Sequence, residues 1–97
     1  MAVYGIAQIT IADRDVYARY EADFMEVFGQ FQGRLLAVDE APQVLEGDWS
    51  ATRVVLMSFP DEAAFRDWYG SPAYQEIARH RHDGSTGVVL LTKGLPG

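Results

Sequence analysis

Residues 44–74 read VLEGDWSATRVVLMSFPDEAAFRDWYGSPAY, and this stretch decides the fold class. Its centre, residues 53–59, is an apolar run typical of a central strand that is buried on both faces. The Pro-Asp pair at 60–61 predicts a helix start, because an aspartate carboxylate accepts a free amide of the first turn. Gly70 ends that helix, and the Ser-Pro pair at 71–72 predicts the start of another. The stretch therefore predicts a turn, a central strand and two consecutive helices.

The rest of the chain adds strands at both ends and a long helix. Four more segments have the composition of strands, at 3–11, 34–38, 43–46 and 86–93, with turns expected at 39–42 and 83–84. Apolar side chains at three- and four-residue steps after Asp13 predict an amphipathic helix that Gly33 ends. This order predicts an α+β domain with a ferredoxin-like βαββαβ layout, in which helices cover one face of an antiparallel sheet.

Length and composition limit the classes of function. The 97 residues form one expected domain, 1–97, and the absence of cysteine excludes disulfides and thiolate metal sites and fits a cytoplasmic protein. Eight Lys and Arg oppose fourteen Asp and Glu, a net charge of -6 that disfavours nucleic acids and anionic membranes as partners. The apolar N-terminus has no basic region and is too short to span a bilayer, so we expect neither a secretion signal nor a membrane span.

The strands are apolar on both of their faces, although helices are expected to cover only one face of the sheet. Residues 53–59 and 3–11 show this pattern most clearly. An apolar sheet face is not suited to water. A second copy that packs sheet against sheet around a two-fold axis is the simplest cover, so we expect a homodimer.

The motifs in this stretch carry a family resemblance. The turn Glu46-Gly47-Asp48-Trp49, together with Phe59-Pro60, Trp68-Tyr69, Ser71-Pro72 and Tyr74, resembles the bacterial family called "domain of unknown function 1330" over nearly the whole chain. The resemblance implies a dimeric α+β barrel, a group that also includes small monooxygenases and lactone isomerases. It implies no reaction, because a shared fold does not supply a function.

Four aromatic residues are candidates for a binding pocket. Neighbours on a helix point about 100° apart, so Trp68 is expected to face inward and Tyr69 to face another way. Trp68 and Tyr74 either pack in the core or line a pocket between helices and sheet, where a ligand would be apolar or aromatic. Trp49 either covers a sheet edge or the dimer partner, or shapes the same pocket.

Charged residues give two more candidate sites. Arg53 either clamps Asp48 or Glu46 in an ion pair or binds an anionic group of a substrate. Glu46 or Asp48 is a candidate general base. The alternative is that both residues only form a turn.

The Arg79-His80-Arg81-His82-Asp83 segment is a cationic cluster at an expected helix end. It complements the helix dipole, or His80 acts as an acid-base group while Arg81 holds an anion. A metal site would need a third ligand beside the two histidines, so no metal and no other cofactor is expected.

These candidates predict a cofactor-free enzyme acting on a small apolar or aromatic molecule, either neutral or acidic. His80 or Tyr69 would move a proton, and the substrate would be held by Trp49, Arg53, Trp68, Tyr74 and Arg81. Isomerisation or oxygenation is the chemistry that similar folds imply. A binding module without a reaction and a structural dimer with a solid core are the alternatives.

Overall fold

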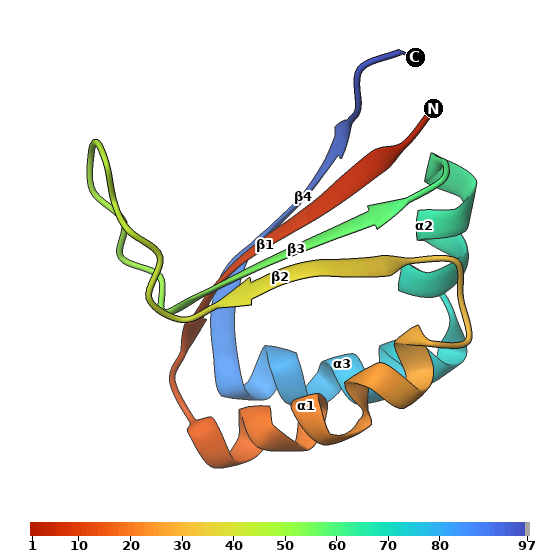
Figure 1. Cartoon of the computed structure of the whole chain (residues 1–97). Helices are drawn as coiled ribbons and strands as arrows, with labels where there is room; N and C mark the ends of the chain where they lie inside the picture. The colour runs from red at the N-terminus through yellow and green to blue at the C-terminus, as the bar shows by residue number, and fades with distance from the viewer. Residues whose placement is uncertain (97) are drawn as a thin grey trace.

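A computed structural model describes residues 1–96 of the chain, and it has two layers (Figure 1). The elements are β1 (Val3–Ile11), α1 (Arg14–Phe28), β2 (Arg34–Asp39), β3 (Arg53–Phe59), α2 (Glu62–Tyr69), α3 (Pro72–Gly84) and β4 (Ser85–Lys93). The strands form one sheet in the order β2-β3-β1-β4, and every neighbouring pair is antiparallel. This is the predicted ferredoxin-like βαββαβ fold, with the helices on one side of the sheet.

The central strand β1 sets which side chains face the helices. Its residues alternate between buried and half-buried, so that Val3, Gly5, Ala7 and Ile9 lie under the helix layer. In the register of the sheet, Ala7 lies opposite Val55 of β3 on one side and Val89 of β4 on the other. The alternate residues of β1 face away from the helices, as expected from the period of two in a strand.

Each helix begins at the residue that the sequence predicted. The Asp13 carboxylate accepts a hydrogen bond from the Val16 amide at 3.2 Å. The Asp61 carboxylate accepts one from the Ala64 amide at 2.8 Å, and the Ser71 hydroxyl accepts one from an amide of the first turn of α3 at 3.1 Å. These caps satisfy amides that have no partner within the helix.

The first helix is shorter than predicted. It ends at Phe28, and the Gly29 amide donates to the Met25 carbonyl at 2.9 Å. The predicted helix was too long because Phe31 continues the apolar spacing. Phe31 packs against the core, but from the loop that follows the helix. Gly33 is not the helix cap: a Cβ atom built there would lie 2.6 Å from ring atoms of both Phe28 and Phe59. Its role is therefore close packing.

Residues 43–46 are not a strand, which corrects a second prediction. They lie in a long connection between β2 and β3, which we call the 40–52 loop, and which extends away from the body of the domain in Figure 1. Leu45 at its tip is 87% exposed. The segment has the composition of a strand, but no neighbouring strand pairs with it in the sheet. Composition alone therefore does not make a strand without a hydrogen-bonding partner.

The turn predicted at residues 83–84 is also absent. Helix α3 runs through Gly84, and β4 begins at the next residue. The Gly84 carbonyl accepts hydrogen bonds from the amides of Ala12 and Asp13, at 2.9 and 3.0 Å. A Cβ atom at Gly84 would lie 2.8 Å from the Tyr17 nitrogen, so this glycine allows the end of α3 to touch the start of α1.

An aromatic cluster joins the helices to the sheet. Trp68 is 2% exposed, and its ring stacks on Phe59 at 5.6 Å and meets the edge of Phe28 at 5.2 Å. The predicted inward orientation of Trp68 is therefore confirmed. Among the described residues, no helix is both long enough and apolar enough to cross a membrane.

The packing role of Gly33 predicts the effect of a methyl group. We expect Gly33→Ala to lower the free energy of unfolding by about 1–3 kcal/mol, because the two phenylalanine rings have to move to admit it. Gly29→Ala is the control, since Gly29 has φ -66° and its only close neighbour is the Met25 carbonyl at 3.0 Å. Urea denaturation measures both variants. An equal loss in the two would show that Gly33 has no special packing role.

Candidate functional site

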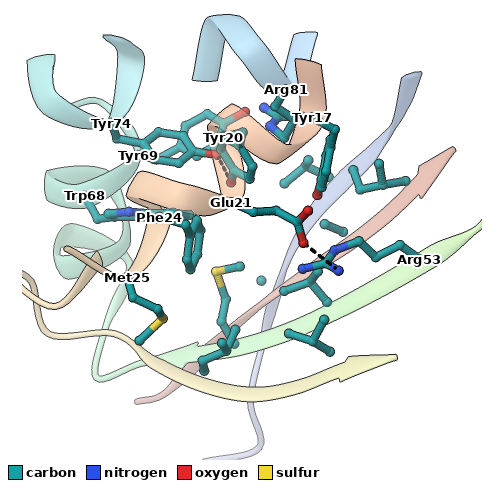
Figure 2. Close-up of a pocket in the computed structure, with 18 of the residues that line it drawn as sticks. Tyr17, Tyr20, Glu21, Phe24, Met25, Arg53, Trp68, Tyr69, Tyr74 and Arg81 are labelled. Carbon is teal, nitrogen blue, oxygen red and sulfur yellow. Dashed lines mark hydrogen bonds and ion pairs between the residues drawn. The ribbon is translucent and has the colours of Figure 1, made fainter. Parts of the chain in front are cut away.

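A cavity of about 170 Å³ lies between the sheet and the helix layer (Figure 2). Its floor is formed by residues of β1 and β3, and the Met57 side chain fills the space over Gly5. Its walls are the aromatic side chains Tyr17, Tyr20, Phe24, Phe65, Trp68, Tyr69 and Tyr74. Its rim includes three exposed apolar side chains, Met25, Leu35 and Val38. The site therefore suits a small, largely apolar or aromatic molecule.

Two phenols meet inside this cavity. The hydroxyl oxygens of Tyr20 on α1 and Tyr74 on α3 lie 2.9 Å apart in a buried hydrogen bond. Burial raises the pKa of Tyr20 far above its usual value, and burial also raises the pKa of Tyr74 and of Tyr17. The three phenols are therefore neutral at physiological pH and are able to donate hydrogen bonds.

Arg81 brings a positive charge into the cavity from α3. Its side chain is buried, with 8% of the residue exposed, and Figure 2 shows it next to Tyr17 and Tyr20. Its Nε atom is buried and has no hydrogen-bond partner. No carboxylate among residues 1–96 forms an ion pair with it. A guanidinium stays charged in proteins, so this site holds a buried cation without a counter-ion.

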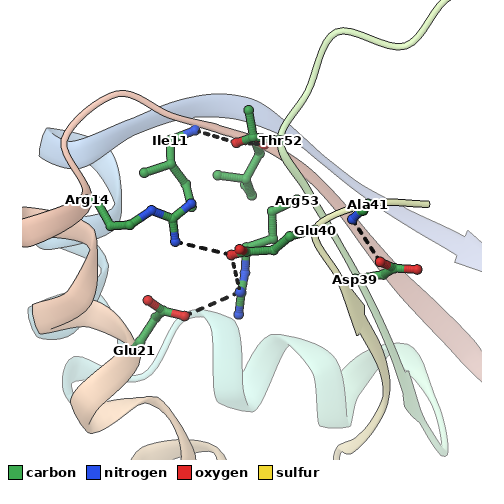
Figure 3. Close-up of polar contacts among 9 residues, drawn as sticks. Ile11, Arg14, Glu21, Asp39, Glu40, Ala41, Thr52 and Arg53 are labelled. Atoms are coloured by element: carbon green, nitrogen blue, oxygen red, sulfur yellow. Dashed lines mark hydrogen bonds and ion pairs between the residues drawn. The ribbon is translucent and has the colours of Figure 1, made fainter.

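Arg53 lies at the mouth of the cavity and is held by several contacts (Figure 3). Its Nη1 atom donates to the Glu40 carboxylate at 3.0 Å and lies 3.3 Å from the Glu21 carboxylate. Its guanidinium carbon lies 5.6 Å from the centre of the Tyr17 ring. The predicted ion-pair clamp thus has other partners than Asp48 and Glu46. The Nε atom of Arg53 is buried and has no hydrogen-bond partner.

A shared ion pair fixes Glu40 beside Arg53. Arg14 also contacts the Glu40 carboxylate, at 3.3 Å. Hydrogen bonds from Arg53, and secondly from Arg14, hold the pKa of Glu40 below its usual value. This group joins α1, β3 and the start of the 40–52 loop at one end of the cavity.

The cavity brings together five of the seven residues that the sequence analysis assigned to proton transfer or substrate binding in the predicted enzyme. These are Arg53, Trp68, Tyr69, Tyr74 and Arg81. The other two lie elsewhere. His80 is half-buried on α3 and does not line the cavity, and Trp49 lies on the opposite face of the sheet, where its indole donates to Gln8 at 3.2 Å.

The candidate bases in the turn also lie outside the cavity. Glu46 and Asp48 border an open depression beside Trp49 on the outer face of the sheet. Within the part of the chain that the structure describes, no three His, Asp or Glu side chains are grouped to hold a metal ion.

Sequence reasoning missed the contribution of α1 to this cavity. Tyr17, Tyr20, Glu21 and Phe24 all line it and follow the three- and four-residue spacing of one helix face. Tyr20 and Phe24 were expected only as part of an apolar stripe. The available signal was Glu21, a carboxylate at the border of that stripe.

The fold and the cavity define this chain as a ferredoxin-like α+β protein with an aromatic pocket between its two layers. The model of the family "Domain of unknown function (DUF1330)" matches residues 2–95, so the chain belongs to that family. A comparison with curated protein sequences finds no match.

Several solved structures share the fold. The protein of unknown function RPA0582 from Rhodopseudomonas palustris superposes with a TM-score of 0.80 at 19% identity, covering 99% of this chain and 84% of that one. SnoaB, a cofactor-independent oxygenase from Streptomyces nogalater, has a TM-score of 0.66 at 18% identity, covering 99% and 95%. A dimeric ferredoxin-like protein of unknown function from Thermobifida fusca has a TM-score of 0.66 at 13% identity, covering 94% and 89%.

The ion pairs of Glu40 predict its titration. We expect Arg53→Met to raise the pKa of Glu40 towards its usual value, and Arg14→Met to raise it less, because the Arg53 hydrogen bond is the larger cause. A pKa that is lowered by folding stabilises the protein above the unfolded-state value, and this stabilisation is lost as the pH falls through the folded-state value. Carboxyl ¹³C NMR titration measures the shifts. A larger rise in Arg14→Met than in Arg53→Met would contradict this order.

Proposed function

We propose that the cavity binds a small, largely apolar or aromatic molecule through an oxygen that carries or develops negative charge, and that Arg81 holds this oxygen. The observation that carries the proposal is the buried Arg81 guanidinium, which has an unpaired Nε atom and no carboxylate partner. A buried charge is costly unless it is paired. An anionic ligand oxygen would supply the missing partner, and the aromatic walls would bury the rest of the molecule.

We further propose that the site performs a cofactor-free reaction of the isomerase or monooxygenase type. In either reaction negative charge builds up on a substrate oxygen, and a fixed cation in a dry cavity stabilises that charge most when it is fully developed. Tyr69 lines the cavity and is the proposed proton-transfer residue. We assign His80 no contact with the substrate, because it does not line the cavity. The cofactor-independent oxygenase SnoaB supports this reaction class by analogy of fold.

Binding without a reaction is the second candidate function. Glu21 is the one carboxylate among the residues found to line the cavity, and it already pairs with Arg53 at 3.3 Å. This ion pair occupies the carboxylate, so no unpaired carboxylate base is found among the lining residues. This observation favours capture of a ligand, and assays for turnover of the bound compound separate the two functions.

Arg81 is expected to control the affinity for an anionic aromatic probe. We expect Arg81→Met to weaken benzoate binding about 10- to 100-fold, since a hydrogen bond to a charged group contributes about 1.5–3 kcal/mol. Arg81→Lys keeps the charge but loses the planar guanidinium, so its affinity is expected to lie between the two. NMR titration at millimolar benzoate, read from the arginine Nε–Hε signals, measures the binding.

The matched control is Arg79→Met, which removes an exposed arginine two residues away on the same helix. This variant should bind benzoate like the unmodified protein. Methionine is expected to be tolerated at position 81, because replacing a buried unpaired charge by an apolar side chain of similar size is often neutral or stabilising. Unchanged binding in Arg81→Met, or equal weakening in Arg79→Met, would refute the proposal.

We also propose that the chain forms a homodimer through the sheet face that points away from the helices. On this face Ile6 of β1 lies opposite Leu56 of β3 and Leu90 of β4 in one cross-strand row. Leu90 is 47% exposed and its neighbour on the same face, Val88, is 55% exposed. The dimeric ferredoxin-like relative from Thermobifida fusca supports this assembly by analogy. Burying this apolar row would add a favourable hydrophobic contribution that a small domain lacks.

A charge on this face is expected to break the dimer. Leu90→Lys should shift the mass in solution from two chains to one, because a lysine at the centre of an apolar interface loses its hydration. Leu95→Lys is the control, since Leu95 is 94% exposed after the end of β4 and should leave the mass unchanged. Light scattering coupled to size-exclusion chromatography measures both. A monomer in the unmodified protein at micromolar concentration would exclude the dimer.

A further inference from the structure

Glu21 places a negative charge at the mouth of an otherwise apolar and cationic cavity. It projects from α1 towards β3, where its carboxylate meets Arg53 at 3.3 Å (Figure 2). Its side chain is 36% exposed, so it borders both the cavity and the solvent. The charged residues that line the cavity are Glu21, Arg53 and Arg81, which sum to one positive charge.

The two members of this ion pair are held unequally. Arg53 has a second carboxylate partner, Glu40 at 3.0 Å, and its guanidinium lies over the Tyr17 ring. Its side chain is 14% exposed. Glu21 makes no other side-chain hydrogen bond or ion pair within residues 1–96. Arg53 would therefore keep its position if the Glu21 side chain turned away, and Glu21 is the member that is free to leave.

Three unpaired donors belong to residues that line the cavity, and one of them is the Nε1 atom of the Trp68 indole. The other two are cationic. The Nε atoms of Arg53 and Arg81 are both buried, and neither has a hydrogen-bond partner. Each lies on a side chain that lines the cavity, one on β3 at the mouth and the other on α3. A ligand that satisfies both needs two acceptor oxygens, and the one at the mouth has to compete with the Glu21 carboxylate.

We propose that Glu21 is a specificity-determining residue that competes with a carboxylate of the ligand for Arg53. The ligand is a small apolar or aromatic carboxylic acid with a second oxygen for Arg81, a carbonyl or phenol oxygen that develops negative charge. Its carboxylate displaces Glu21 from Arg53, which a neutral group cannot do as well. The exchange costs little because the Glu21 side chain is 36% exposed and its carboxylate is solvated when it leaves, while the ligand carboxylate takes its place on Arg53. This inference rests on the proposed function, since it takes the cavity as the binding site and Arg81 as the holder of the second oxygen.

The test compares 4-hydroxybenzoate with its neutral analogue 4-hydroxybenzamide. We expect Glu21→Gln to bind 4-hydroxybenzoate roughly two- to fivefold more tightly than the unmodified protein, because the competing charge is lost while the size of the side chain is kept. The affinity for 4-hydroxybenzamide should not change. Glu26→Gln is the matched control, because Glu26 is an exposed glutamate of α1 that does not line the cavity, and the net charge changes equally.

The readout is the Nε–Hε NMR signal of each arginine, which reports weak binding at the residue itself. The Arg53 signal should move on addition of 4-hydroxybenzoate in both the unmodified protein and Glu21→Gln. Unchanged or weaker 4-hydroxybenzoate binding in Glu21→Gln would overturn the inference, as would equal tightening for the amide or in Glu26→Gln.

The results of these experiments distinguish a wrong proposed function from a wrong inference about Glu21. If benzoate binds and Arg81→Met weakens that binding as expected, while Glu21→Gln has no effect on 4-hydroxybenzoate, only the competition by Glu21 is wrong. If neither aryl acid moves the Arg81 signal at tens of millimolar, both the proposed function and this inference are wrong.

Discussion

The packing of the helix layer onto β3 through one aromatic cluster is the constraint on which the rest of the structure depends. Trp68 lies at its centre, 5.2 Å from Phe28, 5.6 Å from Phe59 and 4.3 Å from Tyr74, measured between ring centres. These contacts join all of the helices to the sheet on one side of the cavity. Between this cluster and the sheet the layers do not close completely, although the Met57 side chain lies over Gly5 of β1. The cavity is the space that remains.

Much of the fold was predictable from local signals. Asp13, Asp61 and Ser71 each supply the oxygen that caps a helix, and such signals depend only on residues within one turn. The incorrect predictions concern positions whose role is set by contacts with residues distant in the sequence. Gly33 was predicted as a helix cap, but a glycine is needed there because the rings of Phe28 and Phe59 leave no space for a Cβ atom. Gly84 looks like a turn residue, yet its carbonyl is paired with the start of α1.

The candidate site was predicted only in part, because its geometry also depends on residues that are distant in the sequence. Arg53 and Arg81 stand out because cations are rare in this acidic chain, and both reach the cavity. Trp49 stood out equally, but the sequence does not say on which face of the sheet the 40–52 loop lies. Glu21 was not predicted as a site residue, because glutamates at solvent-facing positions of amphipathic helices are common. Only the meeting of α1 with β3 shows that it points to Arg53.

Arg81 is the residue that favours a binding site over a purely structural core in the space between the layers. If the space between the layers served only stability, an apolar side chain at position 81 would fill it without the cost of burying a charge. The phenols of Tyr20 and Tyr74 are neutral, because burial raises the pKa of both, so they supply no negative charge to Arg81. In a chain of net charge -6, carboxylates are plentiful, yet none among the described residues is paired with Arg81. The missing counter-charge is therefore best supplied by a ligand that enters the cavity.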